Sequence, residues 1–186
     1  MNGGSRLRTV FIFTLAVVVI HLVTVWAAPR LIMQVVMNGP HAKTLNMQNQ
    51  AAFSEPITAA SRAVVMPSPD MLYSMCVFDL SKGPVQITAN PQLKSYWSIA
   101  LYAANSDNFF VINDRQAGDA PVDLTIVPAG PVSWAVPSGD KGGKGSTLIT
   151  SPSTQGFLLM RVLTGNYQAE KSTVEPARRT LHCQQG

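Results

Sequence analysis

The sequence predicts a mainly β protein, an antiparallel and jelly-roll-like β-sandwich that is preceded by one N-terminal transmembrane helix. Three observations support this class. An uncharged apolar run occupies residues 10–28, short apolar runs separated by turn-forming residues follow it, and 13 Gly with 13 Pro argue for many turns rather than a helical bundle. The length of 186 residues suits one ordinary domain with a core of its own.

Composition excludes several classes of protein. Charged residues make up 13% of the chain, against roughly 25% in ordinary soluble domains, and hydrophobic residues make up 46%. This balance is the opposite of that in a disordered chain. Two cysteines are too few for a disulfide-dense miniprotein or a structural zinc cluster.

The net charge of +4 is carried by the ends of the chain. Residues 51–167 hold eight acidic and seven basic side chains, so this stretch is close to neutral. A nucleic-acid-binding surface needs basic side chains gathered along a groove or patch. The charge distribution therefore argues against nucleic acid as a partner.

The first predicted element is the membrane helix. Residues 10–28 carry no formal charge, and at about 1.5 Å per residue they match the roughly 30 Å of a bilayer core. Trp26 lies where an aromatic belt residue is expected, with Pro29 and Arg30 at the interface. The transmembrane helix and its extension past that interface cover residues 10–37, and inner-membrane lipid is the expected partner. His21 inside it is either a neutral side chain bonded to a carbonyl, to Thr24 or to a neighbouring helix, or a functional intramembrane group.

The basic flank over residues 1–9 sets the expected orientation. Arg6 and Arg8 predict a cytoplasmic N-terminus, so the chain after the helix faces the periplasm from the inner membrane. A cleaved signal peptide is the competing interpretation, because residues 25–27 resemble a small-residue cleavage site. The apolar run is longer than the core of a typical signal peptide, which favours an uncleaved anchor.

Beyond the helix, we expect a linker over residues 38–61, a periplasmic β-sandwich domain over residues 62–167 and a C-terminal tail over residues 168–186. Nine short segments have the apolar character and the flanking turns of strands: residues 63–66, 72–79, 85–89, 96–102, 109–113, 122–127, 133–136, 147–150 and 156–163. Strands at this spacing indicate a sandwich or barrel. In the segment 72–79, both sets of alternating side chains are largely apolar, which predicts a strand covered on both faces.

Two short motifs carry a resemblance to a known family. Residues 70–74 have the pattern Asp-x-Leu-Tyr-Ser, and residues 79–84 have the pattern Asp-Leu-Ser-x-Gly-Pro. With further similar stretches up to residue 163, they make the chain resemble the bacterial domain of unknown function family 1254. Ser68 and Met71 stand where longer members usually carry Asn and Thr, which indicates a short, membrane-anchored branch. The resemblance implies a β-sandwich or jelly-roll-like domain, commonly encoded or fused with a companion β domain of the unknown function family 1214, and it supplies no function.

Two groups of polar side chains are candidate ligand-binding residues. Asp70 and Tyr73 lie at the start of a predicted strand, where Asp70 is either the acceptor of an Asx turn or an acid beside a phenol at a pocket mouth. Asn105, Asn108 and Arg115 belong to the densest polar stretch, which is either a solvated loop rim or a ligand contact. No metal site, cofactor or catalytic residue is expected, because the three histidines lack ligand spacing and no nucleophile motif is present.

The two cysteines are a candidate disulfide. Cys76 lies in a predicted buried strand and Cys183 near the C-terminus. In the periplasm a bond between them would close a loop on the order of 100 residues, worth about 4 to 5 kcal/mol in the chain-entropy relation. Two free thiols are the equal alternative, because the sequence gives no Cα separation.

These observations favour a non-catalytic, single-span envelope protein whose β-sandwich binds another protein, as an accessory subunit of a membrane complex or of a companion β-domain protein. The alternative is a small-molecule or carbohydrate-binding module, or a hydrolase-like enzyme, that uses the open end of the sandwich. Its stacking surface would come from five aromatic residues: Tyr73, Tyr96, Trp97, Tyr102 and Trp134.

Overall fold

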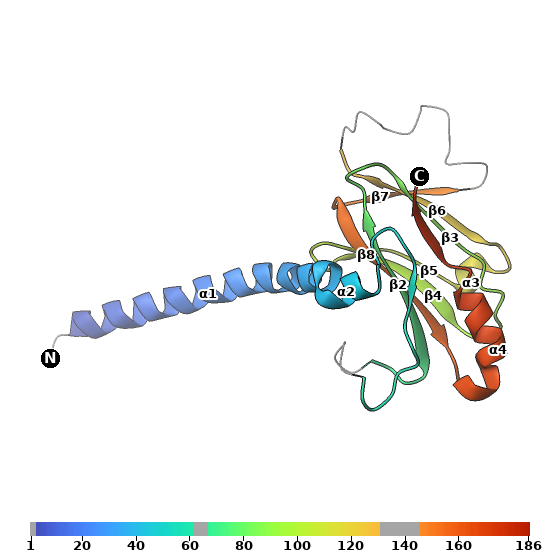
Figure 1. Cartoon of the computed structure of the whole chain (residues 1–186). Coiled ribbons are helices and arrows are strands. Elements are labelled where there is room, and N and C mark those ends of the chain that lie inside the picture. The colour runs from blue at the N-terminus through green and yellow to red at the C-terminus, as the bar shows by residue number, and fades with distance from the viewer. Residues whose placement is uncertain (1–2, 62–66, 131–145) are drawn as a thin grey trace.

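The computed structural model describes residues 3–61, 67–130 and 146–186 and shows a long helix attached to a two-layer β domain (Figure 1). The helices are α1 (Gly3–Asn38), α2 (Pro40–Thr44), α3 (Asp114–Ala117) and α4 (Tyr167–Arg178). The strands are β1 (Ala52–Phe53), β2 (Met71–Asp79), β3 (Val85–Ala89), β4 (Trp97–Ala103), β5 (Asn108–Asn113), β6 (Val122–Pro128), β7 (Thr147–Ser151), β8 (Gln155–Leu163) and β9 (His182–Gln185). The predicted fold class, a mainly β domain after one long apolar helix, is confirmed.

Two sheets form the layers. One has five strands in the order β1-β2-β8-β4-β5, and the other has four in the order β7-β6-β3-β9. Strands β2–β8 correspond to seven of the predicted segments, whereas the expected strands 63–66 and 133–136 lie outside the described residues. Among the paired strands that the structure describes, β6 and β7 run parallel, and the other pairs are antiparallel.

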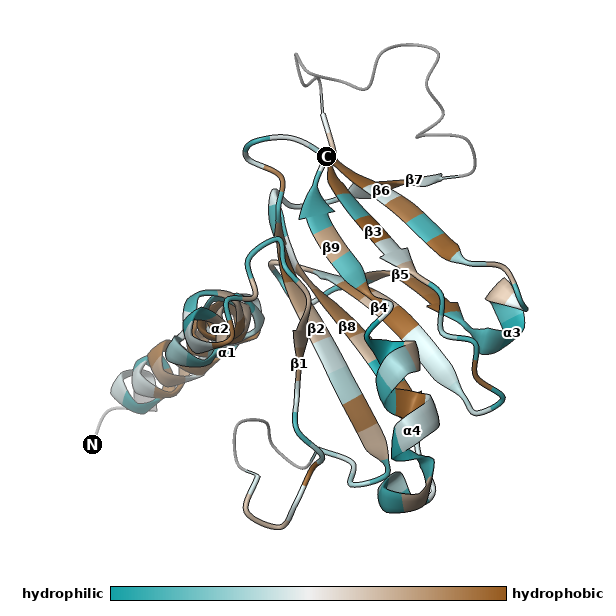
Figure 2. Cartoon of the chain, turned by 45° about the vertical axis from the view of Figure 1, so that its right-hand side comes forward, coloured by the Kyte–Doolittle hydropathy of each residue, from teal (hydrophilic) through white to brown (hydrophobic). Residues whose placement is uncertain are grey.

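The main core lies between the two sheets. Phe78, Ile99 and Leu158 point inward from the five-stranded sheet and meet Ile87 and Ile126 from the other sheet, and all five side chains are fully buried. Figure 2 shows hydrophobic and hydrophilic residues alternating along β6, as expected for a strand with one buried face. Burial of each such side chain stabilises the fold by about 1.5 to 3 kcal/mol.

Strand β2 is buried on both faces, as its apolar alternation predicted. It pairs along its whole length with β8, from Met71 opposite Leu163 to Asp79 opposite Gln155. Side chains such as Cys76 enter the core between the sheets, whereas Val77 points to the outer face and is also buried. The outer face is covered because the end of α1 and α2 pack against it.

The C-terminal segment departs from the expected tail. Residues 168–186 form most of α4 and all of β9, and β9 pairs with β3 to complete the four-stranded sheet. Asn166 caps α4 by accepting a hydrogen bond from the backbone N–H of Ala169 at 3.2 Å. The sequence does not reveal this strand, because His182–Gln185 contains one apolar side chain, Cys183, and its pairing partner lies about a hundred residues earlier in the chain.

The segment 38–61 is also more structured than a linker. It contains α2 and β1, and β1 adds an edge strand to the five-stranded sheet beside β2. Met47 is 2% exposed, and its carbonyl accepts a hydrogen bond from the backbone N–H of Val77 at 2.8 Å. The segment is ordered by burial of Met47 and by backbone pairing with β2, and the polar composition of residues 38–61 gives no sign of either.

Candidate functional site

The junction between α1 and the β domain is built around methionines. Met33 and Met37 are four residues apart, so they lie on one face of the last turns of α1, and both are buried. They pack with Met47 and Met75, and with buried residues of α2, β1, β2 and β8: Ala42, Ala52, Val77 and Phe157. Methionine suits this place because its flexible side chain fills irregular gaps between a helix and a sheet. We call these eight residues the methionine cluster.

The chain passes from α1 into α2 through one tight turn. The backbone N–H of Gly39 donates to the carbonyl of Val35 at 2.9 Å, and a Cβ atom at this glycine would collide with the same carbonyl. Pro40 follows as the first residue of α2, where its missing N–H costs no hydrogen bond. Helix and domain are therefore joined by packed, short-range structure rather than by a flexible tether.

A second contact lies near the predicted membrane surface. Ser106, in the turn between β4 and β5, donates its hydroxyl to the carbonyl of Pro29 at 3.0 Å. Close by, the guanidinium of Arg30 lies 4.4 Å from the ring centroid of Trp26 and also donates to the Trp26 carbonyl. A cation beside an indole at the end of an apolar run is typical of a membrane interface. Towards the N-terminus from Trp26, every side chain over residues 4–25, His21 included, is exposed.

The structure divides the predicted ligand-binding residues between two ends of the five-stranded sheet. Asp70, Tyr73 and Arg115 belong to the end where β2 begins and β5 finishes, and Asn105 and Asn108 belong to the turn between β4 and β5 at the other end. Asp70 and Arg115 are exposed. The five residues therefore do not form one pocket.

Three of these residues have structural bonds. The Tyr73 hydroxyl accepts a hydrogen bond from the backbone N–H of Ser68 at 3.0 Å, which fixes the approach to β2. Asn105 donates to the side chain of Asp107, two residues away. Asn108 donates to the carbonyls of Leu101 and Phe110 at 3.1 and 3.3 Å, beside the irregular register of β4 and β5.

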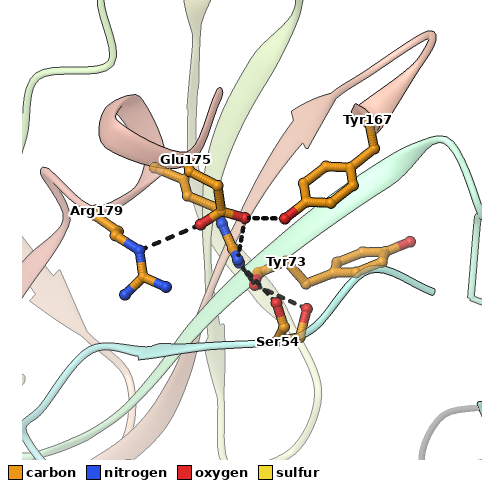
Figure 3. Close-up of polar contacts among 6 residues, drawn as sticks. Ser54, Tyr73, Tyr167, Glu175 and Arg179 are labelled. Carbon is orange, nitrogen blue, oxygen red and sulfur yellow. Dashed lines mark hydrogen bonds and ion pairs between the residues drawn. The ribbon is translucent and has the colours of Figure 1, made fainter. Parts of the chain in front are cut away.

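A buried ionic network fastens α4 to the edge of the five-stranded sheet (Figure 3). The side chain of Arg178 is 2% exposed and donates to the carbonyls of Ser54 and Tyr73 at 2.9 and 3.1 Å. It also donates to the carboxylate of Glu175 at 2.7 Å. The same carboxylate accepts a hydrogen bond from Arg179 at 3.2 Å. The two terminal nitrogens of the guanidinium thus bond to a carboxylate and two backbone carbonyls, whereas its buried Nε has no hydrogen-bond partner among the described residues. The three charge-assisted bonds hold the helix in place.

Neighbouring groups shift the pKa values of two residues in this network, Glu175 and Tyr167. Burial alone raises the pKa of Glu175, but the hydrogen bond and positive charge of Arg178, with the Tyr167 hydroxyl and Arg179, lower that pKa below its ordinary value. The Tyr167 hydroxyl donates to Glu175 at 3.0 Å, and desolvation followed by this bond raises the pKa of Tyr167. Glu175 is therefore a charged acceptor at neutral pH and not a proton donor.

A shallow hollow of about 480 Å³ lies beside this network. Its charged or titratable walls are Asp123 from β6, Arg179 at the end of α4 and His182 from β9. The remaining lining is small or apolar: Thr88, Ala89, Asn90, Pro121, Val122, Pro176 and Thr180. Sequence reasoning missed this hollow, because its three charged or titratable residues come from separate segments and share no local motif.

A disulfide joins Cys76 in β2 to Cys183 in β9, with the two Cα atoms 6.5 Å apart. Both residues are buried in the core, with exposures of 0% and 5%. The bond connects the two sheets and ties the last strand to the centre of the domain. Over the described ranges, His, Cys, Asp and Glu side chains form no group of three or more that is placed to hold a metal ion.

The features described so far define a class of protein: a two-sheet β domain, closed by a C-terminal helix and strand, that is carried on a long apolar helix. Residues 47–185 match the family described as Protein of unknown function (DUF1254), and the chain belongs to that family. This confirms the resemblance that the sequence motifs indicated. The match includes α4 and β9, consistent with their place in the fold. No curated protein matches the chain.

The solved structures that resemble the chain include the following two. The VPA0106 protein from Vibrio parahaemolyticus has a TM-score of 0.63 and 12% sequence identity, and the similarity covers 87% of this chain and 36% of that one. An uncharacterized protein from Burkholderia cenocepacia has a TM-score of 0.47 and 12% identity, with 77% of this chain and 36% of that one covered. The chain thus spans about a third of the length of either protein. The first likeness supports the fold.

Proposed function

We propose that this protein is a single-span inner-membrane protein whose β domain lies on the periplasmic side and serves as a non-catalytic accessory subunit of a membrane protein complex. The observation that carries the proposal is the packed junction at the methionine cluster. It holds the β domain directly against the end of α1, whereas the preceding residues 4–25 stay uncovered along their whole length. A helix that is apolar, exposed and long enough to cross a bilayer is suited to lipid contact.

The charge distribution and the disulfide support the orientation. Arg6 and Arg8 precede the apolar run, and basic residues favour the cytoplasmic side of a span. The disulfide between Cys76 and Cys183 fits an oxidising compartment such as the periplasm. Both features support the proposed orientation, with the N-terminus of the helix inside and the β domain outside.

The accessory role is supported by the rigidity of the junction. A catalytic or ligand-capturing domain on a flexible tether samples many orientations, whereas a subunit of an assembly is held at one height and one angle. Here the Gly39–Pro40 turn and the hydrogen bond from Ser106 to Pro29 fix the height and the angle of the β domain relative to the helix. This arrangement favours docking against another envelope protein, including a companion β-domain protein.

The hollow beside α4 favours a second candidate function, a small-molecule or carbohydrate-binding module. Its volume of about 480 Å³ lies in the range of ligand pockets, and Asp123, Arg179 and His182 offer polar contacts. The aromatic platform expected for such a module is weaker than the sequence suggested, because Trp97 is 2% exposed and belongs to the core. Trp134 lies outside the described residues. A ligand that raises the melting temperature of the wild type but not of Arg179→Ala would favour this candidate.

Fractionation tests the proposed function. The full chain should stay in the membrane after alkaline carbonate washing, and protease added to spheroplasts should digest the β domain. After mild solubilisation, native electrophoresis should show the protein in an assembly larger than a dimer of the 20.0 kDa chain. Release by carbonate would refute the anchor, protection from protease would refute the orientation, and migration as a monomer or dimer alone would refute the accessory role.

A further inference from the structure

Over residues 4–26 every face of α1 is exposed, and one face carries a regular side-chain pattern that continues to Val35. Residues spaced alternately three and four apart follow this face from the membrane run into the part of the helix that joins the domain. They are Thr14, Val17, His21, Thr24, Ala28, Leu31 and Val35. We call these residues the seam. At 3.6 residues per turn the seam fits within an arc of about 100°, the pattern by which two parallel helices pack in a coiled coil.

The seam lies opposite the face that carries the domain. Met33 and Met37, which dock the domain, are turned roughly half a revolution from Leu31 and Val35. Leu31 and Val35 are accordingly 64% and 70% exposed. The β domain therefore leaves the seam free for a second helix, and two domains would sit on the outside of such a pair.

Lipid alone does not account for the seam. Leu31 and Val35 follow Pro29 and Arg30, beyond the predicted membrane run of residues 10–28, so the hydrocarbon core does not cover them. At the other end, Thr14 and His21 are polar side chains exposed at membrane depth. An occupant must therefore satisfy polar groups inside the membrane and cover apolar ones outside it.

We propose that a second copy of this chain occupies the seam, in parallel orientation. Two copies in one membrane share the same topology, so each His21 meets the other His21 at the same depth. A neutral imidazole carries one donor and one acceptor nitrogen, which makes the pair self-complementary. Thr24 keeps a free lone pair although its hydroxyl donates to the Ile20 carbonyl at 2.8 Å, and the small Ala28 allows close approach of the helices. This inference rests on the part of the proposed function that places α1 across the membrane.

Cysteine cross-linking in native membranes tests the seam, with a matched pair of variants. Val17 lies in the seam and Val19 on the opposite face, and each valine is 49% exposed. After mild oxidation, full-length Val17→Cys should yield about tenfold more product at twice the 20.0 kDa monomer mass than Val19→Cys. Leu31→Cys should also cross-link, because the proposed contact continues outside the membrane. Equal cross-linking of the two valine variants, or products only with a protein of another mass, would overturn the proposal.

The polar contact is tested separately. His21→Leu should weaken dimerisation by about three- to thirtyfold in a fluorescence-transfer titration in vesicles, the range measured for hydrogen bonds between membrane helices. Val23→Leu, on another face of α1, is the control and should leave dimerisation unchanged. An unchanged His21→Leu variant would refute the role of the imidazole. If carbonate releases the wild type, the proposed function fails; if the protein stays embedded but the seam variants do not cross-link selectively, this inference alone fails.

Discussion

Removal of the disulfide between Cys76 and Cys183 should lower the free energy of unfolding of the β domain by about 4.8 kcal/mol. The two cysteines are separated by 107 residues in the sequence. For a closed loop of this length, the chain-entropy relation gives about 16 cal/mol/K, which corresponds to the stated energy at 25 °C. Small domains are stable by only about 5 to 15 kcal/mol, so the loss removes a large share of the total.

Urea unfolding of the full chain in detergent micelles measures this loss. Buried Trp97 reports on the opening of the core. With a denaturant slope of about 2 kcal/mol/M, the midpoint of Cys76→Ala/Cys183→Ala should fall by about 2.4 M relative to the wild type. The wild type unfolded under reducing conditions should show a similar midpoint to the double variant.

The single variants provide the control. Cys76→Ala and Cys183→Ala each break the same bond, so the double variant should lose little more than either single variant. If the two cysteines contributed only as separate buried side chains, the single losses would add. Additive losses, or a double variant within about 1 kcal/mol of the wild type, would refute the reasoning.

Three further substitutions test other parts of the structure. Because the pKa of Glu175 is lowered in the folded protein, its charge stabilises the fold above the ordinary pKa of 4.5, and this contribution is lost as the pH falls through the lower folded pKa. Urea midpoints should therefore drop more between pH 7 and pH 3 in the wild type than in Glu175→Gln. Parallel pH profiles of the two proteins would contradict this. Gly156→Ala should lower the free energy of unfolding by about 1 to 3 kcal/mol in thermal unfolding, because the added Cβ would collide with the Phe78 ring and the Tyr102 carbonyl of β4. An unchanged melting temperature would refute this close packing of β8 against its neighbours. Met47→Ala should lower the free energy of unfolding by about 2 to 5 kcal/mol and speed tryptic cleavage at the exposed Lys43. Met71→Ala, outside the methionine cluster, is the control and should not speed this cleavage. Equal cleavage of both variants would argue against a packed junction.

The sequence predicted the parts of the fold that depend on local pattern. The apolar run of α1 and the alternation in β2 are both visible without a partner segment, because burial of a helix or strand leaves its own periodicity. The turn residues around Gly83 likewise mark the end of β2, although the chain there crosses from one sheet to the other and does not form a hairpin. These features need no knowledge of long-range contacts.

The remaining parts depend on pairs of residues far apart in the chain. Arg178 bonds to the carbonyls of Ser54 and Tyr73, which lie 124 and 105 residues earlier, and no local pattern announces such a bond. The helix that carries Arg178 did have a local signal, the Asn166 cap with Glu170 in the first turn, which the polar composition of the segment obscured. The hollow beside α4 gathers three separate segments and has no such signal.

The packed junction makes α1 and the β domain a single rigid unit. A helix of 36 residues is about 54 Å long, and membrane helices tilt to match the thickness of the surrounding bilayer. Since the Gly39–Pro40 turn and the methionine cluster transmit that tilt without a hinge, a thinner bilayer would swing the whole domain sideways and lower it towards the headgroups. In the proposed membrane placement of α1, the position of the β domain is thereby coupled to the lipid composition of the bilayer.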